Sequence, residues 1–282
     1  MSILATCLTI AALSATAPAE PIRLEAQCGE LVLKAPAPVT IEAEGSTVRG
    51  LRLRGNIRWK GGVLSAPEGL DGFAAGGYAV HISGAGNSLF SARVVNAKKG
   101  VVIDKADRTT IAYTDFIGLR EDGIIASEAR GVSFYSLRFA GSQPKPSQCV
   151  SVGKITYSVP QRDCVAPGDR WTDGNHPDAI QMRNGVTDAT ISNVMVSGAT
   201  AGITQMDTKG DAPLARVEIR HSLIQAGGFY NLITLDRCQD CTIRENTVLP
   251  TPGIAHRAVI IAGTARRCGN FAPDDRTIDA PC

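Results

Sequence analysis

A triplet of short apolar segments recurs along most of this chain, and this repeat constrains the possible fold more than any other feature. Segments such as Tyr78–Ile82, Gly100–Asp104 and Ala179–Arg183 each follow a small or turn residue. A second apolar segment comes next, as at Val217–Ile219, and a third ends at a turn of small residues. One such unit cannot bury its own apolar face, so the repeat indicates coils that stack on one another.

Three strands per coil, joined by turns of uneven length, predict an all-β fold: a right-handed parallel β-helix (solenoid) from about Ala26 to Ala265. No window of the chain after the first 19 residues keeps the apolar spacing of an amphipathic helix. A β-sandwich would show hairpin turns such as Asn-Gly, and Asn184–Gly185 is the only such pair. The less regular segment before Gly77 is expected to form the first coils.

The stretch from 142 to 177 interrupts the repeat and is rich in proline and polar residues. Long excursions from a regular scaffold are usually either functional or disordered. Cys149 and Cys164 flank a polar loop within it, and in an oxidising compartment they are expected to pair. The fold prediction therefore includes a disulfide-clamped loop insertion that forms a wall beside a groove.

The first residues indicate export. The apolar run Ile3–Leu13 is too short to span a bilayer, and Ala17–Ala19 resembles a signal-peptide cleavage site. We expect residues 1–19 to be a signal peptide and residues 20–282 to form a single domain. The protein would then be secreted or periplasmic, with no membrane-spanning segment in the mature chain.

In such a compartment the remaining cysteines are expected to form disulfides rather than to bind zinc. With Cys7 in the leader, Cys28 would remain as a buried free thiol. Cys282 is expected to attach the tail to the last coil. Three pairings are possible among the last four cysteines, and the sequence leaves them open: Cys238, Cys241, Cys268 and Cys282.

The formal net charge of +2 is small for 282 residues and gives no reason to expect a nucleic-acid partner. We expect a monomer. His81, His221 and His256 are expected to be ordinary surface or turn residues. Asn193 and Asn246 are expected to fill turns, as parts of an asparagine ladder.

Strand alternation assigns side chains to the two faces of each strand. If Ile180 and Met182 point into the core, Gln181 and Arg183 point outward. Aligning the later coils on this one places Thr204 and Met206 inside. The outward columns then consist of Gln181, Gln205 and Thr234 in one row, and of Arg183, Asp207 and Asp236 in the next. Earlier coils extend the second row with Ser83, Asp104 and Ser127.

Polar residues gather where the chain re-enters this strand. The turn Asn175–Asp178 lies beside these columns and is expected to face a later turn that carries Tyr230 and Asn231. Such a strip suits an extended, hydroxyl-rich ligand, and we expect an acidic polysaccharide. The candidates for catalysis are His176, Arg183 and Asp178. The candidates for substrate binding are Asn175, Gln181, Gln205, Tyr230 and Asn231.

The repeat, the leader and the turn His176-Pro177-Asp178-Ala179-Ile180-Gln181 resemble the pectate-lyase-like superfamily of secreted right-handed β-helix proteins, over roughly Tyr78 to Gly263. Many members of that superfamily are polysaccharide lyases or hydrolases, and some are not enzymes. The Asn-Thr-Asp, Asp-Asp and His-Gly set of the polygalacturonase-like hydrolases is absent here, which lowers that option.

β-Elimination from a uronate-containing glycan is the leading hypothesis. His176 is the expected base, because a histidine pKa lies near working pH, and Arg183 can hold a substrate carboxylate through two nitrogens. Arg183 would instead be the base if Ca²⁺ held the carboxylate, with Asp178, Asp207 and Asp236 as ligands. Hydrolysis through paired aspartates is the first alternative, since Asp207 and Asp236 lie one coil apart. A non-catalytic glycan-binding protein is the second.

Overall fold

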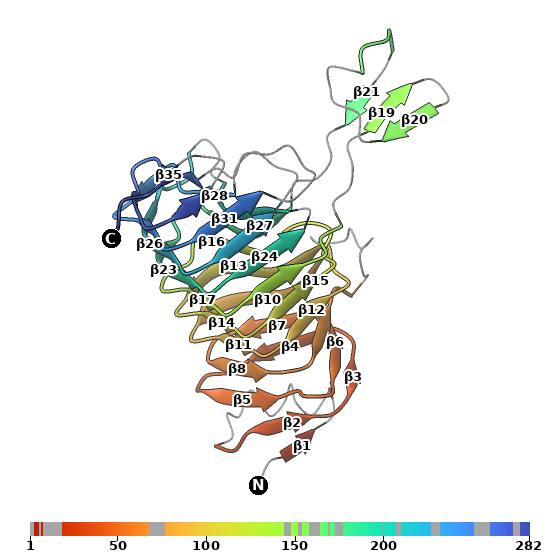
Figure 1. Ribbon diagram of the computed structural model, residues 1–282. Helices are drawn as coiled ribbons and strands as arrows, with labels where there is room; N and C mark the ends of the chain where they lie inside the picture. The colour runs from red at the N-terminus through yellow and green to blue at the C-terminus, as the bar shows by residue number, and fades with distance from the viewer. Residues whose placement is uncertain are drawn as a thin grey trace.

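The computed structural model describes residues 3–5, 7, 19–67, 77–143, 148–151, 154–157, 164–168, 170–172, 177–198, 200–206, 210–226, 232–250, 260–272 and 277–282. Its strands stack in register into three long sheets that form the sides of one solenoid, with the N-terminal coils at one end and the C-terminal coils at the other (Figure 1). The expected right-handed parallel β-helix is confirmed, and its coils extend from Ile22 to Ala272, slightly beyond the predicted bounds.

The first face is a nine-stranded parallel sheet. Its strands are β4 (Leu31–Lys34), β7 (Leu51–Arg54), β10 (Tyr78–Ala85), β13 (Lys99–Asp107), β16 (Ile124–Ser127), β22 (Asp178–Arg183), β25 (Ala201–Gln205), β28 (Ile233–Thr234) and β32 (Ile260–Ile261).

The second face is a twelve-stranded sheet. Its strands are β1 (Ile3–Ala5), β2 (Ile22–Leu24), β5 (Val39–Glu42), β8 (Ile57–Lys60), β11 (Ser88–Phe90), β14 (Thr110–Ala112), β17 (Ser133–Tyr135), β23 (Thr187–Ser192), β26 (Leu214–Arg220), β29 (Cys238–Gln239), β30 (Thr242–Arg244) and β33 (Arg266–Cys268).

The third face is an eleven-stranded sheet that ends in an antiparallel pair, β34 with β35. Its strands are β3 (Gln27–Cys28), β6 (Thr47–Arg49), β9 (Val63–Ser65), β12 (Arg93–Val95), β15 (Asp115–Ile117), β18 (Arg138–Ala140), β24 (Met195–Gly198), β27 (Leu223–Ala226), β31 (Thr247–Pro250), β34 (Phe271–Ala272) and β35 (Thr277–Ile278).

The core is built from columns of like residues. Ile124, Ile180, Ile203 and Ile233 pair in successive strands of the first face, and all four are fully buried. At the corner between the third and first faces the core instead contains the stacked rings of Phe116 and Phe139, whose centroids are 4.5 Å apart. Small residues beside the rings, such as Gly123, leave room for them.

The corner between the second and third faces is a tight turn that repeats from coil to coil. Each turn places one residue in the left-handed region, with φ between 50° and 55° at Ser91, Tyr113, Ser136, Asn193, His221 and Glu245. The residue after each of these turn residues is buried, and in the C-terminal coils Ser222, Asn246 and Asn270 form the expected ladder. Asn270 Oδ1 accepts the N–H of Asn246 at 3.0 Å, and Asn246 Oδ1 accepts the N–H of Ser222 at 3.0 Å. The turn position of Asn193 and the ladder position of Asn246 are thus confirmed, but the expectation that Asn193 also belongs to the ladder was wrong, because its side chain is exposed.

The disulfides agree in part with the pairings predicted from the sequence. Cys149 pairs with Cys164 as predicted, and Cys282 attaches the tail by pairing with Cys268. The open pairing is settled as Cys238–Cys241 and Cys268–Cys282. The prediction for Cys28 was wrong, because it pairs with Cys7 in the segment expected to be the leader.

The insertion forms its own three-stranded antiparallel sheet, which lies apart from the coils in Figure 1. Its strands are β19 (Gln148–Ser151), β20 (Lys154–Tyr157) and β21 (Arg170–Thr172). In the described part of the chain they pair only with one another. No helix among the described residues has the length and hydropathy needed to cross a bilayer.

Candidate functional site

The first face presents two outward columns of side chains, because alternate residues of each strand point away from the core. Ladder pairing defines one column as Arg52, His81, Val102, Ile125, Gln181, Thr204 and Thr234. The second contains Asp104, Ser127 and Arg183 in consecutive strands, as expected from the sequence. Arg54 and Ser83 pair in the earlier strands, and the register shifts just after Ile82.

The predicted alignment of the later coils was wrong by one residue. Gln181 pairs with Thr204, and Gln205 pairs with the buried Met182. Gln205 therefore points inward, where its side chain donates to Arg237 O at 2.9 Å and accepts from Arg237 N at 3.0 Å. Both polar atoms of its amide thus have backbone partners, and its side chain does not lie in the outward column of Gln181. Met206, expected inside, is 53% exposed.

The other candidates are distributed as follows. Gln181 and Arg183 point outward from β22, Arg183 being exposed, and Asp236 is exposed beyond β28. Asn175, His176, Asp207, Tyr230 and Asn231 lie outside the described residues. Of the three aspartates considered for Ca²⁺, only Asp178 and Asp236 can thus be placed, and no group of three potential metal ligands occurs in the described residues.

Asp178 lies at the corner where the insertion rejoins the solenoid, and it is only 6% exposed. Its backbone N–H donates to Asp122 Oδ1 at 3.0 Å, and its Oδ2 accepts from Gln181 Nε2 at 2.9 Å. Asp122, the residue at the same position of the preceding coil, is 8% exposed. The structure therefore brings together Asp178 and Gln181 of the predicted set, and adds Asp122, which the sequence reasoning missed.

The carboxyl group of Asp122 has a strongly shifted pKa. Burial, followed by the charge of Asp178, raises the pKa of Asp122 to about 7, while the N–H of Asp178 and the ammonium of Lys99 oppose the shift. The adjacent hollow, lined by Asp178, Glu121 and Thr200, has a volume of about 10 Å³. That is room for about one water molecule and none for a sugar ring.

An open polar cluster lies further along the same face, on β7 and β10. The rings of Tyr78 and His81 are 5.5 Å apart, and the guanidinium of Arg52 lies 5.8 Å from the centre of the Tyr78 ring. Arg52 Nε is also 2.7 Å from Glu30 Oε1. We call Arg52, Tyr78 and His81 the β10 cluster. Its aromatic, imidazole and guanidinium groups can stack on, deprotonate and neutralise an acidic ligand.

His81 is half-buried, and within the described residues its Nδ1 has no hydrogen-bond partner. Burial lowers the pKa of His81; Asp104 acts in the opposite direction, and the charges of Arg52 and Arg54 lower the pKa further. The imidazole is therefore neutral at pH 7 and can accept a proton. The sequence contained a signal for this residue, since aligning Tyr78–Ile82 with Ala179–Arg183 places His81 in the column of Gln181.

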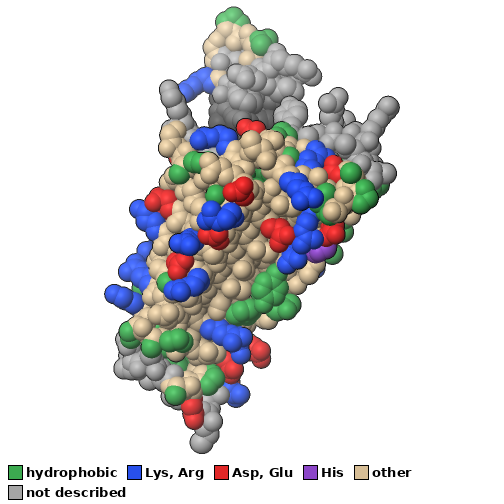
Figure 2. Space-filling view, turned by 90° about the vertical axis from the view of Figure 1, so that its left-hand side faces the viewer, with side chains coloured by type: hydrophobic (Ala, Val, Ile, Leu, Met, Phe, Trp, Pro, Cys, Tyr) green, Lys and Arg blue, Asp and Glu red, His purple; other side chains and the backbone are tan. Residues whose placement is uncertain are grey.

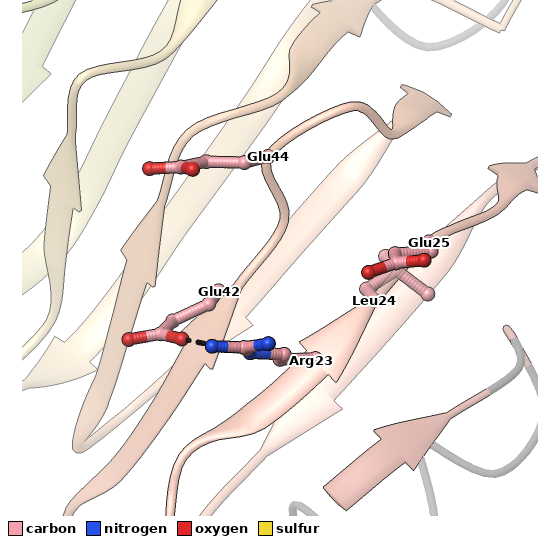
Figure 3. Close-up of a pocket in the computed structure, with 5 residues that line it drawn as sticks. All are labelled: Arg23, Leu24, Glu25, Glu42 and Glu44. Atoms are coloured by element: carbon pink, nitrogen blue, oxygen red, sulfur yellow. Dashed lines mark ion pairs between the residues drawn. The ribbon is translucent and has the colours of Figure 1, made fainter. Parts of the chain in front are cut away.

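A second hollow lies on the N-terminal coils, with a volume of about 250 Å³, and is shown in Figure 3. Arg23 points to Glu42 there, with Nε 3.5 Å from Oε2, while Glu25 and Glu44 lie apart from that pair. These carboxylates do not converge on one point, so the hollow has no chemistry comparable with that of the first face.

No protein-family model and no curated protein sequence matches this chain. Among solved structures it is similar to the Dettilon tailspike protein, with a TM-score of 0.55 and 13% identity, over 95% of this chain and 52% of that one. The chain thus spans about half the length of that protein. It is also similar to an alginate lyase from Paenibacillus sp. strain FPU-7, with a TM-score of 0.50 and 13% identity, over 95% and 86% of the two chains. At this identity the likeness establishes the parallel β-helix fold.

Proposed function

We propose that this protein is an exported polysaccharide-active protein of the pectate-lyase-like type, which binds an acidic glycan on its first face and cleaves it by β-elimination. The observation that carries the proposal is the β10 cluster, where a neutral imidazole adjoins a guanidinium and a phenol ring on an outward column. The three disulfides that lie beyond the expected leader support export, since such bonds persist in oxidising compartments. An alginate lyase and a phage tailspike have the same fold, which supports a glycan ligand.

In the proposed reaction, Arg52 and His81 have separate roles. Arg52 would neutralise the carboxylate of a uronate, which makes the hydrogen at C5 more acidic. His81 would remove that proton, the electron pair would form the new double bond, and the bond to the glycosidic oxygen at C4 would break. The protonated imidazole then carries the proton that the leaving oxygen needs. Gln181 and Arg183, further along the face, would bind other sugars of the chain.

The test is turnover of polygalacturonate, alginate and hyaluronan, followed by the ultraviolet absorbance of the unsaturated product. We expect His81→Ala to reduce turnover by about 10²–10⁴-fold, the usual effect of losing a general base. His221→Ala is the matched control, because His221 is exposed on another corner and pairs with Glu245 at 3.3 Å. Full activity in His81→Ala together with loss in His176→Ala would move the base to the turn before β22.

Hydrolysis is the second candidate, because the raised pKa of Asp122 beside Asp178 matches an acid and base pair. The burial of both side chains weighs against it. New reducing ends without ultraviolet absorbance would identify a hydrolase. Binding without either product would identify a glycan-binding protein.

A further inference from the structure

The second face carries a row of small hydroxyl side chains that the proposed reaction does not use. Ser88, Thr110, Ser133 and Thr190 pair in consecutive strands and point outward. We call these four residues the hydroxyl strip. Figure 2 looks onto this face and shows an uncharged band running along the solenoid between two rows of charged side chains. Because adjacent strands are about 4.8 Å apart, the hydroxyl groups recur at about that spacing, which is close to the length of one sugar unit in an extended glycan.

Aromatic rings border the strip on the side of the tight turns, and form a hydrophobic patch in Figure 2. Phe90 and Tyr135 lie in the neighbouring outward column, two coils apart. Tyr113 is 59% exposed and meets Tyr135 edge to face, with centroids 5.2 Å apart. Arg58 covers Phe90 at 4.8 Å from the ring centre. Rings beside hydroxyl groups offer both kinds of contact that a sugar needs: a surface for its C–H face and partners for its hydroxyl edge.

Three residues of the strip and two of the rings line an open hollow of about 500 Å³. It is lined by Phe90, Thr110, Ser133, Tyr135, Thr190 and Arg220, among others. In the described part of the chain, no hydrogen bond takes up the side-chain hydroxyl of any strip residue, and all four are partly exposed. They remain available to a ligand.

The charged side chains around the strip form ion pairs with one another. On one side Asp188 accepts from Arg216 at 2.5 Å and from Arg130 at 3.2 Å. At the end of the strip, Glu218 occupies the next position of the same column, opposite Thr190, and lies 2.8 Å from Arg244 and 3.3 Å from Arg220. The strip itself is uncharged between Arg58 and Glu218, the preceding and following residues of its column, so it complements a ligand without net charge. It differs in this from the first face, where Arg52 and Arg54 add positive charge beside His81.

We propose that the second face is a separate binding site for a neutral glycan chain, which runs along the solenoid axis and stacks one ring against Tyr135. Its hydroxyl groups bond with the strip while the first face remains free. The site does not depend on cleavage at the β10 cluster, so it can be tested whether or not the protein is an enzyme.

The test is binding to an array of neutral β-glucans, xylans and mannans, with polygalacturonate and alginate as charged comparators. We expect at least one neutral glycan to bind, and Tyr135→Ala to weaken that binding about tenfold. Thr190→Val, which removes one hydroxyl and keeps the shape, should also weaken it. Thr242→Val is the matched control, because Thr242 lies in the same column beyond Glu218, outside the hollow. Phe271→Ala removes an exposed ring from the third face and controls for aromatic loss.

Two results would overturn the proposal. The first is that no neutral glycan shows binding weakened by Tyr135→Ala and Thr190→Val, including the case in which only the charged polymers bind. The second is self-association in solution that disappears in Tyr135→Ala, which would make this face a contact between copies of the chain. Loss of β-elimination in His81→Ala with unchanged neutral-glycan binding is the expected separation of the two faces.

Discussion

Asp122 is a buried carboxyl group at a corner of the solenoid, and we expect it to make the stability of the protein depend on pH. It stacks under Asp178, accepts that residue's N–H, and has a pKa of about 7 because of burial and the neighbouring negative charge. The unfolded chain has the ordinary value of about 3.9. The folded state therefore binds this proton more tightly, so the associated stability is complete below about pH 4 and is lost as the pH rises through about 7.

We expect Asp122→Asn to remove the loss of stability at high pH, because an amide can accept the same N–H without carrying a charge. At pH 8 the variant should be more stable than the parent, by at most about 4 kcal/mol for a shift of this size. At pH 4 the two should be nearly equal. Thermal unfolding at both pH values measures the difference.

Asp236→Asn is the control for this experiment, since Asp236 is exposed. It should change stability little at either pH. An unchanged pH dependence in Asp122→Asn would mean that the Asp122 carboxyl group is not the source of the effect.

At the scale of a strand, the pairing register decides which side chains can form a site. The sequence predicts the strands and the outward column of Asp104, Ser127 and Arg183, because the apolar alternation there is clear. It misleads at β25, where the shared pair Gln-Met suggests aligning Gln205 with Gln181. Burial of Ile203 between Ile180 and Ile233 sets a register one residue away, and such a slip turns every side chain to the opposite face.

Other parts of the site depend on contacts that a sequence does not contain. The pKa of Asp122 follows from its stacking under Asp178, across a sequence separation of 56 residues. The environment of His81 follows from Arg52 in the preceding coil. The prediction of a free thiol at Cys28 was wrong, because it placed the partner, Cys7, in a leader that is removed. Local sequence patterns thus predict the strands of each coil, whereas contacts between residues far apart in sequence determine the chemistry of the site.

Glycines at the same position of two adjacent coils, Gly100 and Gly123, make room for the stacked phenylalanine rings. A Cβ at Gly123 would overlap Phe139 Cε1 and lie 2.5 Å from Ala179 O. We expect Gly123→Ala to destabilise the protein by about 1–3 kcal/mol, as overpacking of a tight core usually does. Denaturant unfolding measures this cost.

Gly29→Ala is the matched control, because no atom lies within 4 Å of a Cβ placed there. Its effect should stay within about 0.5 kcal/mol. Equal stability of the two variants would show that the Phe116–Phe139 corner can move apart at little cost.

At the scale of the whole molecule, the solenoid and the sheet of β19–β21 are separate structural units. Cys149 and Cys164 close a loop of sequence separation 15, for which the expected stabilisation is about 3 kcal/mol. We expect Cys149→Ser with Cys164→Ser to leave the thermal midpoint of the coils unchanged, while the insertion becomes sensitive to limited proteolysis. Calorimetry and mass mapping of the fragments check both parts.

The double variant Cys268→Ser with Cys282→Ser provides the comparison, since that bond fastens the tail to the last coil. There the main transition itself should move to lower temperature. A fall of the main transition in the Cys149 variant would instead mean that the small sheet supports the coils.

The ladder passes from β16 directly to β22, with Ser127 opposite Arg183, although the whole insertion lies between the two strands in sequence. The pairing of these two coils therefore does not involve the insertion, which branches off between them. An inserted segment at this junction can change in length and composition during evolution while the two faces stay in register. Such a molecule can acquire a new specificity at its edge without having to find a new fold.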